Sequence, residues 1–342
     1  MRILLIKMSS LGDVIHTLPA ITDAKAMMPS LEIDWVVEEA FAEIPSWHKG
    51  VNEVIPIALR RWRKNPLKAF RSGEWKRFKS KLESRQYDLV IDAQGLLKSA
   101  LVAKLVGVPV LGYDSCSIRE PVASLFYNKC FAVSRSLHAV ERMRHLFSVI
   151  MGYGLSWQEL DYGIVINKDE NNVPYIVFLH GTTWQTKHLP EDQWKILAER
   201  MVNLGFEVRV LWGNSQEKER ADRLGEIAGV RVMPKMSLRE VASLLKGASA
   251  VISVDTGLGH LAAALGCPLV ALYGPTSARL TGIYGRRQVS ISAEYHCAPC
   301  MKRRCRYQQV KDDFEFAPPC WNKVKLDDVQ YQLEQLIAAS NV

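Results

Sequence analysis

Short apolar runs alternate with longer amphipathic segments along the whole chain. The runs are rich in β-branched residues, and we expect them to be buried parallel strands, which appear in a sequence as nearly continuous apolar stretches. The predicted strands cover 2–7, 33–37, 88–92, 108–112, 175–179, 208–212, 251–254 and 269–273.

Helical periodicity fills the segments between these strands. The predicted helices cover 14–27, 96–106, 191–204, 216–227, 237–246, 259–265 and 326–339. Strands that alternate with helices predict an α/β fold, and the pattern occurs separately in each half of the chain. We therefore predict two doubly wound, Rossmann-like domains, 1–168 and 169–342, divided by a polar segment with turn residues. The last helix could also pack back on the first domain.

Charge adds a constraint on partners. The 342 residues include 44 Lys and Arg against 36 Asp and Glu, a formal net charge of +8. Such an excess favours an anionic partner: nucleic acid, a phosphorylated metabolite or an acidic membrane surface. No apolar run reaches 18 residues, and the apolar start of the chain is too short for a signal peptide. We expect a cytosolic protein whose seven cysteines are reduced.

The loop Met8-Ser9-Ser10-Leu11-Gly12-Asp13 follows the first predicted strand and opens a helix. Ligands of open α/β sheets bind at the carboxyl ends of strands, where this loop would lie. Asp13 therefore has two possible roles, a helix cap or a catalytic base. The loop lacks the G-x-G-x-x-G pattern of dinucleotide-binding proteins.

Two loops in the second half have the composition of phosphate-binding loops. After the strand at 175–179, Thr182, Thr183 and Lys187 provide hydroxyl groups and a positive charge. After the strand at 251–254, Asp255, Thr256 and Gly257 open a helix whose N-terminal amides would bind an anion, and His260 follows one turn later. A solvated surface loop and a structural histidine are the alternative interpretations.

The segment from Arg60 to Lys81 is densely basic, and aromatic residues are interleaved in it: Trp62, Phe70, Trp75 and Phe78. A solvated helix face is the simplest interpretation. The combination also suits contact with anionic lipid head groups, and RNA is a competing partner.

Cys297, Cys300, Cys305 and Cys320 lie close together near the C-terminus, with His296 beside them. Four thiolates, or three with a histidine, can complete a tetrahedral zinc site. The spacing does not match a common zinc ribbon, so a loop of reduced thiols is the alternative.

With these features, the chain resembles the lipopolysaccharide heptosyltransferases of glycosyltransferase family 9. The resemblance runs from residue 1 to about 290 and is carried by these stretches: KMSSLGDVIHTLP at 7–19, WVVEE at 35–39, IPSWH at 44–48, RRWRK at 60–64, DAQGLLKS at 92–99, REP at 119–121, PKMSL at 234–238, VDTG at 254–257 and YGPT at 273–276.

The resemblance implies a GT-B fold, in which two Rossmann-like domains face each other across a cleft. It implies an inverting transfer of L-glycero-D-manno-heptose from ADP-heptose to Kdo on lipid A, without metal or cofactor. Acceptor binding belongs to the first domain and nucleotide-sugar binding to the second. The protein would be peripheral on the cytosolic face of the inner membrane, with no nucleic acid as partner.

Site residues follow from the resemblance position by position. Asp13 is the expected base. The expected donor-binding residues are Thr182, Thr183, Lys187, Glu217, Met236, Asp255, Thr256, Gly257 and His260. The expected acceptor-binding residues are Ser10, Arg60, Arg61, Arg63, Lys64, Lys98 and Arg119.

Three alternatives remain at this point. Heptosyltransferase II or another family 9 transferase would keep the donor site and change the acceptor. A non-catalytic module that binds anionic surfaces would explain the charge but not the loops. The cysteine segment at 296–321 departs from the best-known pattern of these enzymes, although similar cysteine segments appear elsewhere in the family, so the acceptor could be one Kdo, a phosphorylated Kdo or a Kdo disaccharide.

Overall fold

The computed structural model describes residues 1–155, 160–168, 173–309 and 316–339. It divides into two compact units, Met1–Val165 and Ile166–Val342. The division falls close to the predicted boundary between residues 168 and 169, although the polar residues 169–172 lie outside the described part.

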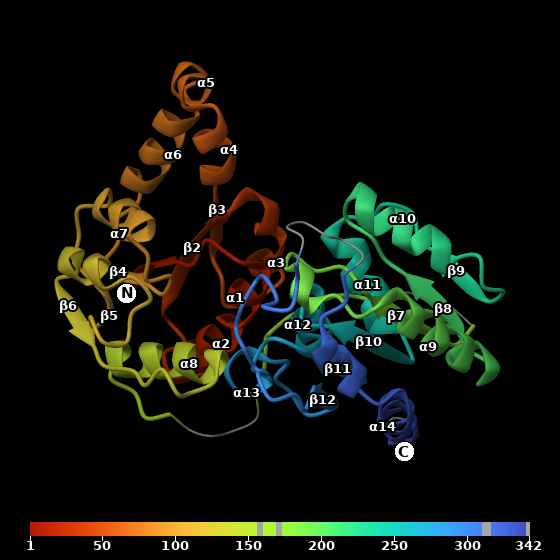
Figure 1. Cartoon of the computed structure of the whole chain (residues 1–342). Helices are drawn as coiled ribbons and strands as arrows, with labels where there is room; N and C mark the ends of the chain where they lie inside the picture. Colours follow the sequence, from red (N-terminus) through yellow and green to blue (C-terminus); the bar gives the residue numbers. More distant parts are fainter. Residues whose placement is uncertain (156–159, 169–172, 310–315, 340–342) are drawn as a thin grey trace. The chain divides into compact units, whose positions relative to one another are not determined.

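Unit 1 contains a parallel sheet of six strands in the order β3-β2-β1-β4-β5-β6 (Figure 1). Its strands are β1 (Arg2–Ile6), β2 (Glu32–Glu38), β3 (Glu53–Ile57), β4 (Leu89–Asp92), β5 (Val110–Tyr113) and β6 (Lys129–Phe131). The inner strands are almost completely buried, because helices cover both faces of the sheet.

The helices of unit 1 connect these strands. They are α1 (Leu11–Ile15), α2 (Leu18–Met27), η1 (Glu39–Phe41), α3 (Glu43–Ser46), α4 (Leu59–Lys64), α5 (Pro66–Arg71), α6 (Glu74–Glu83), α7 (Leu97–Lys104), η2 (Pro121–Phe126) and α8 (Ala139–Met151). Helix α2 packs on α8. Helices α6 and α7 share a core through Phe78, Leu82, Val102 and Ala103, on the other face of the sheet from α2 and α8 (Figure 1).

Unit 2 has a second parallel sheet, in the order β12-β11-β10-β7-β8-β9. Its strands are β7 (Tyr175–Leu179), β8 (Glu207–Val210), β9 (Val230–Val232), β10 (Ala250–Val254), β11 (Leu269–Tyr273) and β12 (Gln288–Ser292). Its helices are η3 (Gln185–Lys187), α9 (Glu191–Asn203), α10 (Ser215–Leu224), α11 (Leu238–Gly247), α12 (Gly257–Ala264), α13 (Ala278–Thr281), η4 (Pro319–Lys323) and α14 (Leu326–Ala338).

The C-terminal helix belongs to unit 2. Helix α14 packs on α9 and on strands β10, β11 and β12. Its Val329 and Leu333 are buried in the same core as Trp321 and Trp194. The core of unit 2 therefore accounts for the apolar face of α14, which the sequence left open to either domain.

Both sheets have the same strand order when the strands of each unit are numbered from its own start, namely 3-2-1-4-5-6. This is the order of the Rossmann fold. The prediction of two doubly wound α/β units, a GT-B chain, is confirmed. No helix in the described part is both long and apolar enough to span a bilayer.

Candidate active site

Asp13 lies beyond the carboxyl end of β1, in the first turn of α1. Its Oδ2 accepts hydrogen bonds from the Ser10 backbone N–H (2.7 Å) and from the Ser10 hydroxyl (2.9 Å). The cap interaction predicted for Asp13 is therefore present. It uses only one carboxylate oxygen, and the side chain remains 37% exposed.

Lys7 supplies a buried positive charge beside this carboxylate. Its Nζ donates to the carbonyl oxygen of Ala93 (3.0 Å) and lies 3.8 Å from Oδ1 of Asp13. Burial raises the pKa of Asp13, but the charge of Lys7 and the two bonds from Ser10 outweigh it and leave that pKa below its ordinary value. Lys7 itself is 5% exposed, and burial lowers its pKa.

The loop after β4 fixes the loop after β1. The Gln94 amide oxygen accepts from the backbone N–H groups of Met8 and Ser9, each at 2.9 Å. Gly95 has φ +69°, and an added Cβ would lie 2.9 Å from the Ile118 side chain. A side chain at this position is disfavoured by both the backbone and the space. Adjacent loops therefore hold Asp13 and Lys7 in place, and neither Lys7 nor Gln94 was among the predicted site residues.

Three predicted acceptor-binding residues lie near Asp13 or near Glu38, at the end of β2. Arg119 contributes to the lowered pKa of Asp13. The Arg60 backbone N–H donates to Glu38 (3.0 Å), and both Arg60 and Lys98 oppose the rise that burial causes in the pKa of Glu38. Their exposed side chains form a positive surface at this edge of the sheet.

Of the remaining predicted acceptor residues, Ser10 is the N-cap residue of α1, whereas Arg61, Arg63 and Lys64 are on α4 and differ from one another. Arg63 and Lys64 are exposed. Arg61 forms ion pairs with Glu39 (3.0 Å) and Glu74 (2.9 Å), which connect α4 to its neighbours. Arg61 therefore has a structural role whether or not it binds an acceptor.

The aromatic residues of the basic segment were interpreted as contacts for lipid head groups, and this is wrong for three of them. Trp62, Trp75 and Phe78 pack together, with ring centroids 5.8–6.0 Å apart, against the core below α6. The side chain of Phe70 lies outside the described part. Apolar burial is the stronger driving force for such large side chains.

In unit 2, Asp255 contacts three of the other predicted donor residues. Its Oδ2 accepts from the Thr276 hydroxyl (2.6 Å) and pairs with Lys187 Nζ (2.7 Å). His260 Nε2 lies 3.8 Å from Oδ1, and the Thr182 hydroxyl donates to the Asp255 carbonyl oxygen (3.0 Å). The loops after β7, β10 and β11 therefore meet at one buried carboxylate. Thr276 was not among the predicted site residues, although it is the last residue of the YGPT stretch.

The first turn of α10 adds Glu217. This residue accepts from the Gly213 N–H (2.7 Å), and an added Cβ at Gly181 would lie 2.6 Å from its carboxyl carbon. A side chain at Gly181 would therefore displace the Glu217 carboxylate. Thr183 is exposed, and Met236, which follows β9, is partly buried. No hydrogen bond or ion pair joins the side chains of these two residues to the Asp255 group.

Helix α12 begins at this point. Thr256 is its N-cap residue, and its hydroxyl makes no capping hydrogen bond. The first backbone bond of the turn runs from the Gly259 N–H to the Thr256 carbonyl (3.1 Å), so the N–H groups of Gly257 and Leu258 come before it. Such amides at a helix N-terminus can bind a phosphate group.

The four C-terminal cysteines of the predicted cluster line one small cavity of about 20 Å³, together with Tyr295 and Thr186. All four are free thiols, and neighbouring thiols reinforce the burial that raises the pKa of Cys320 to about 11. In the described part of the chain, no three His, Cys, Asp or Glu side chains are arranged to hold a metal ion.

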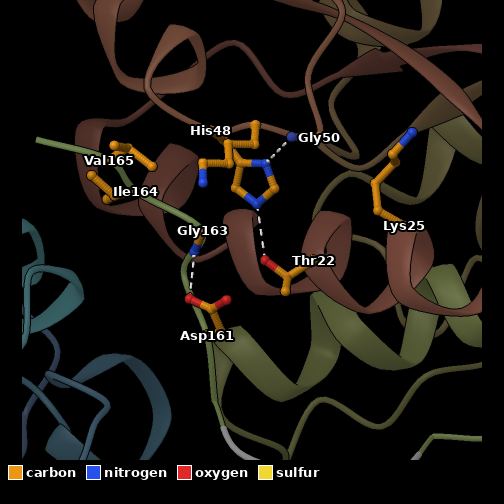
Figure 2. A pocket seen from close by; sticks show the side chains of 9 residues that line it. Thr22, Lys25, His48, Gly50, Asp161, Gly163, Ile164 and Val165 are labelled. Atoms are coloured by element: carbon orange, nitrogen blue, oxygen red, sulfur yellow. Dashed lines mark hydrogen bonds between the residues drawn. The ribbon is translucent and has the colours of Figure 1, made fainter. Parts of the chain in front are cut away.

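A larger cavity, of about 350 Å³, lies elsewhere in unit 1, and Figure 2 shows its lining. At its wall, His48 Nδ1 accepts from the Gly50 N–H and Nε2 lies 2.9 Å from the Thr22 hydroxyl. Since Nδ1 accepts, Nε2 carries the proton, and burial lowers the pKa of His48 to about 4. The imidazole is neutral with both nitrogens bonded, and no predicted site residue lines this cavity.

Comparison with known proteins decides the family. Residues 75–311 match the sequence profile of glycosyltransferase family 9 (heptosyltransferase). The chain belongs to this family. It is therefore a glycosyltransferase.

Individual relatives are also similar over the full length. Lipopolysaccharide heptosyltransferase 1 of Pseudomonas aeruginosa is 50% identical over 99% of both chains. The E. coli heptosyltransferase WaaC, solved with ADP, has a TM-score of 0.86 and 42% identity, covering 98% of this chain and 100% of that one. WaaC with ADP-2-deoxy-2-fluoro heptose has a TM-score of 0.81 and 43% identity, covering 97% and 100%. The resemblance inferred from the motifs is confirmed, and a non-catalytic module is excluded.

Proposed function

We propose that this family 9 glycosyltransferase moves L-glycero-D-manno-heptose from ADP-heptose to a Kdo residue of lipid A, in the synthesis of the lipopolysaccharide inner core. The observation that carries the proposal is the partly exposed Asp13, which Lys7 and Ser10 keep ionised. Full-length similarity to heptosyltransferase 1 and to WaaC solved with an ADP-heptose analogue supports the choice of donor and sugar.

Asp13 acts as the general base. Its Oδ1 is too far from Lys7 for a hydrogen bond, so it retains the capacity to accept the proton of the attacking Kdo hydroxyl. The hydroxyl oxygen displaces ADP in line from the anomeric carbon, which inverts the configuration. General-base assistance of this kind contributes roughly 10²–10⁴-fold.

The donor site stabilises the ADP leaving group. As the glycosidic bond breaks, negative charge grows on the diphosphate, and the α12 amides together with the positive charge of Lys187 oppose it. Asp255, held by Thr276, orients Lys187 toward this region. Thr182, Thr183, Glu217, Met236, Thr256 and His260 complete the proposed donor set.

The proposed acceptor site is positively charged, which suits an anionic ligand. Ser10, Arg60, Arg63, Lys64, Lys98 and Arg119 provide exposed polar or basic side chains, and Arg61 supports them. Kdo carries a carboxylate, and lipid A carries phosphates at the membrane surface. We also propose that the protein attaches peripherally to the cytosolic face of the inner membrane through the basic segment Arg60–Lys81.

Purified protein incubated with ADP-heptose tests the reaction. Mass spectrometry should detect one added heptose on a Kdo–lipid A acceptor, and NMR of the product should show inversion at the anomeric carbon. Parallel acceptors with one Kdo, phosphorylated Kdo and a Kdo disaccharide identify the preferred one. Transfer only to an acceptor that already carries heptose would instead indicate the activity of heptosyltransferase 2.

A further inference from the structure

Four large aliphatic side chains are exposed on two helices of unit 1. Leu97 and Leu101 of α7 are 39% and 51% exposed, and Val122 and Leu125 of η2 are 57% and 82% exposed. Positions four apart on an α-helix share a face, as do positions three apart on a 3-10 helix. Each helix therefore presents an apolar stripe to solvent.

The two helices lie side by side. Helix α7 contacts η2. At one end the Leu97 N–H donates to the Glu120 carboxylate (2.8 Å), and at the other Lys104 Nζ donates to Asn128 (3.3 Å). These contacts hold the two helices together at both ends, and we call their four exposed aliphatic side chains the α7–η2 patch: Leu97, Leu101, Val122 and Leu125.

Basic side chains border this patch. Lys98, Lys104, Arg119 and Lys129 are all exposed. The acidic residue at this edge, Glu120, already accepts a hydrogen bond from Leu97. An apolar centre with a positive border is complementary to an anionic bilayer, whose head groups are negative and whose interior is apolar.

Single exposed apolar residues are common on protein surfaces and carry no meaning alone. Here, however, Lys98 of the proposed acceptor site follows Leu97 in α7, and Arg119 precedes Glu120, whose carboxylate accepts from the Leu97 N–H. The basic segment is also on the same face of the sheet, since α6 and α7 share one core (Figure 1). Charge and apolar surface are thus collected on one side of unit 1.

We propose that the α7–η2 patch inserts into the boundary between head groups and acyl chains of an anionic bilayer, and so adds an apolar, salt-resistant component to membrane binding. The assignment rests on the proposed function in one respect, that the acceptor is carried by a lipid. The binding itself requires no sugar transfer, so the two can be tested apart.

The test is flotation with phosphatidylglycerol–phosphatidylcholine vesicles at low salt and at about 0.5 M NaCl, where charges are screened beyond about 4 Å. The variant is Leu101→Gln with Leu125→Gln, whose exposed positions leave the core intact. We expect its partition coefficient to fall at least about tenfold at both salt concentrations. If the double variant folds poorly, Leu125→Gln alone should give a smaller fall in the same direction.

Met27→Gln is the matched control, because Met27 is 54% exposed on α2, on the opposite face of the sheet. It should bind vesicles as the wild type does. Equal binding by the double variant and the wild type at high salt would overturn the proposal. A second result would also overturn it: a dimeric wild type, a monomeric double variant and equal vesicle binding by the two. The patch would then join two copies of the chain.

Transfer to a soluble, deacylated Kdo acceptor separates this proposal from the proposed function. The double variant should keep wild-type kcat on that acceptor. If the wild type transfers no heptose but the double variant still binds vesicles more weakly, the proposed function is wrong and the proposed membrane contact of the α7–η2 patch is retained.

Discussion

Lys7 Nζ lies 3.8 Å from Asp13 Oδ1, although Lys7 directly follows β1 and Asp13 is in the helix after it. Lys7 is 5% exposed, so its charge is poorly screened by water and acts strongly on its neighbour. The pair explains how a half-buried carboxylate stays ionised and ready to accept a proton.

Lys7→Met should therefore change the pH dependence of the reaction. Burial alone raises the pKa of Asp13, and the methionine removes the main opposing charge. The fraction of ionised base then declines at a higher pH, so the acid limb of the kcat profile should move up by about one pH unit or more. The measurement is the profile from about pH 3 to 8, because the lowered pKa of Asp13 places the wild-type limb in the acidic range.

Lys25→Met is the control for that experiment. Lys25 Nζ is also held by backbone carbonyls, those of Pro29 (2.9 Å) and Leu31 (2.7 Å), but the site does not use it. Its acid limb should match the wild type. A Lys7→Met enzyme with an unshifted limb would show that Lys7 only fills space, even if Asp13 is the base.

Asp13→Asn distinguishes a base from a cap. The amide oxygen of asparagine can still accept the bonds from Ser10, so α1 should remain intact. The amide cannot take up the proton, and kcat should fall by about 10²-fold or more, with melting temperature and ADP-heptose affinity nearly unchanged. Retention of more than about a tenth of wild-type kcat would falsify the base assignment.

The sequence predicted eight strands, and they are the inner strands of the two sheets. Each inner strand has a neighbour on both sides and helices above and below, so its residues form an apolar run. The four strands that were missed, β3, β6, β9 and β12, are the sheet edges. Their partial exposure mixes polar residues into the run and weakens the signal.

Asp13, Thr182 and Asp255 lie just beyond the carboxyl ends of strands, where the rule for open α/β sheets expects site residues. Contacts between loops distant in sequence could not be predicted in the same way. Thr276 lies 21 positions from the Asp255 carboxylate that it binds, and Gln94 lies 86 positions from Met8. Such pairs depend on the strand order, which a local pattern does not encode.

Thr256→Val tests the donor site in unit 2. The Thr256 hydroxyl makes no capping bond, so valine should leave stability nearly unchanged. If the hydroxyl donates to the diphosphate, ADP-heptose should bind about tenfold more weakly and kcat should also fall. Calorimetric titration and steady-state kinetics measure the two effects.

Thr276→Val provides the contrast. Its hydroxyl binds the buried Asp255, so its loss leaves a carboxylate less satisfied and should lower the melting temperature as well. If Thr256→Val instead binds ADP-heptose as tightly as the wild type, that hydroxyl is not part of the donor site.

Turnover should not require a divalent metal. The proposed donor set neutralises the diphosphate with α12 amides and Lys187, and the donor loops lack the D-x-D pair that commonly holds a divalent ion on a diphosphate. Activity in excess EDTA should equal activity without it. Loss of turnover on chelation, with circular dichroism unchanged and recovery on adding Mg²⁺, would contradict this prediction.

Reversal of Arg63 and Lys64 to Glu tests the basic segment. Both side chains are exposed on α4, and Arg61 is left in place because its pairs with Glu39 and Glu74 support the fold. Each basic residue near an anionic surface contributes about 1 kcal/mol, so binding to anionic vesicles at low salt should drop at least about tenfold. The difference from the wild type should shrink as salt rises, because screening removes the same attraction.

Reversal of Arg231 and Lys325 to Glu is the matched control. Both are exposed in unit 2, and each double reversal subtracts four charges, from +8 to +4. If net charge alone controlled attachment, both variants would lose it equally. If the basic segment is the contact, only the α4 variant should detach and show a raised KM for the lipid acceptor. Equal vesicle binding and equal KM in the two variants would therefore show that the α4 face is an ordinary solvated surface.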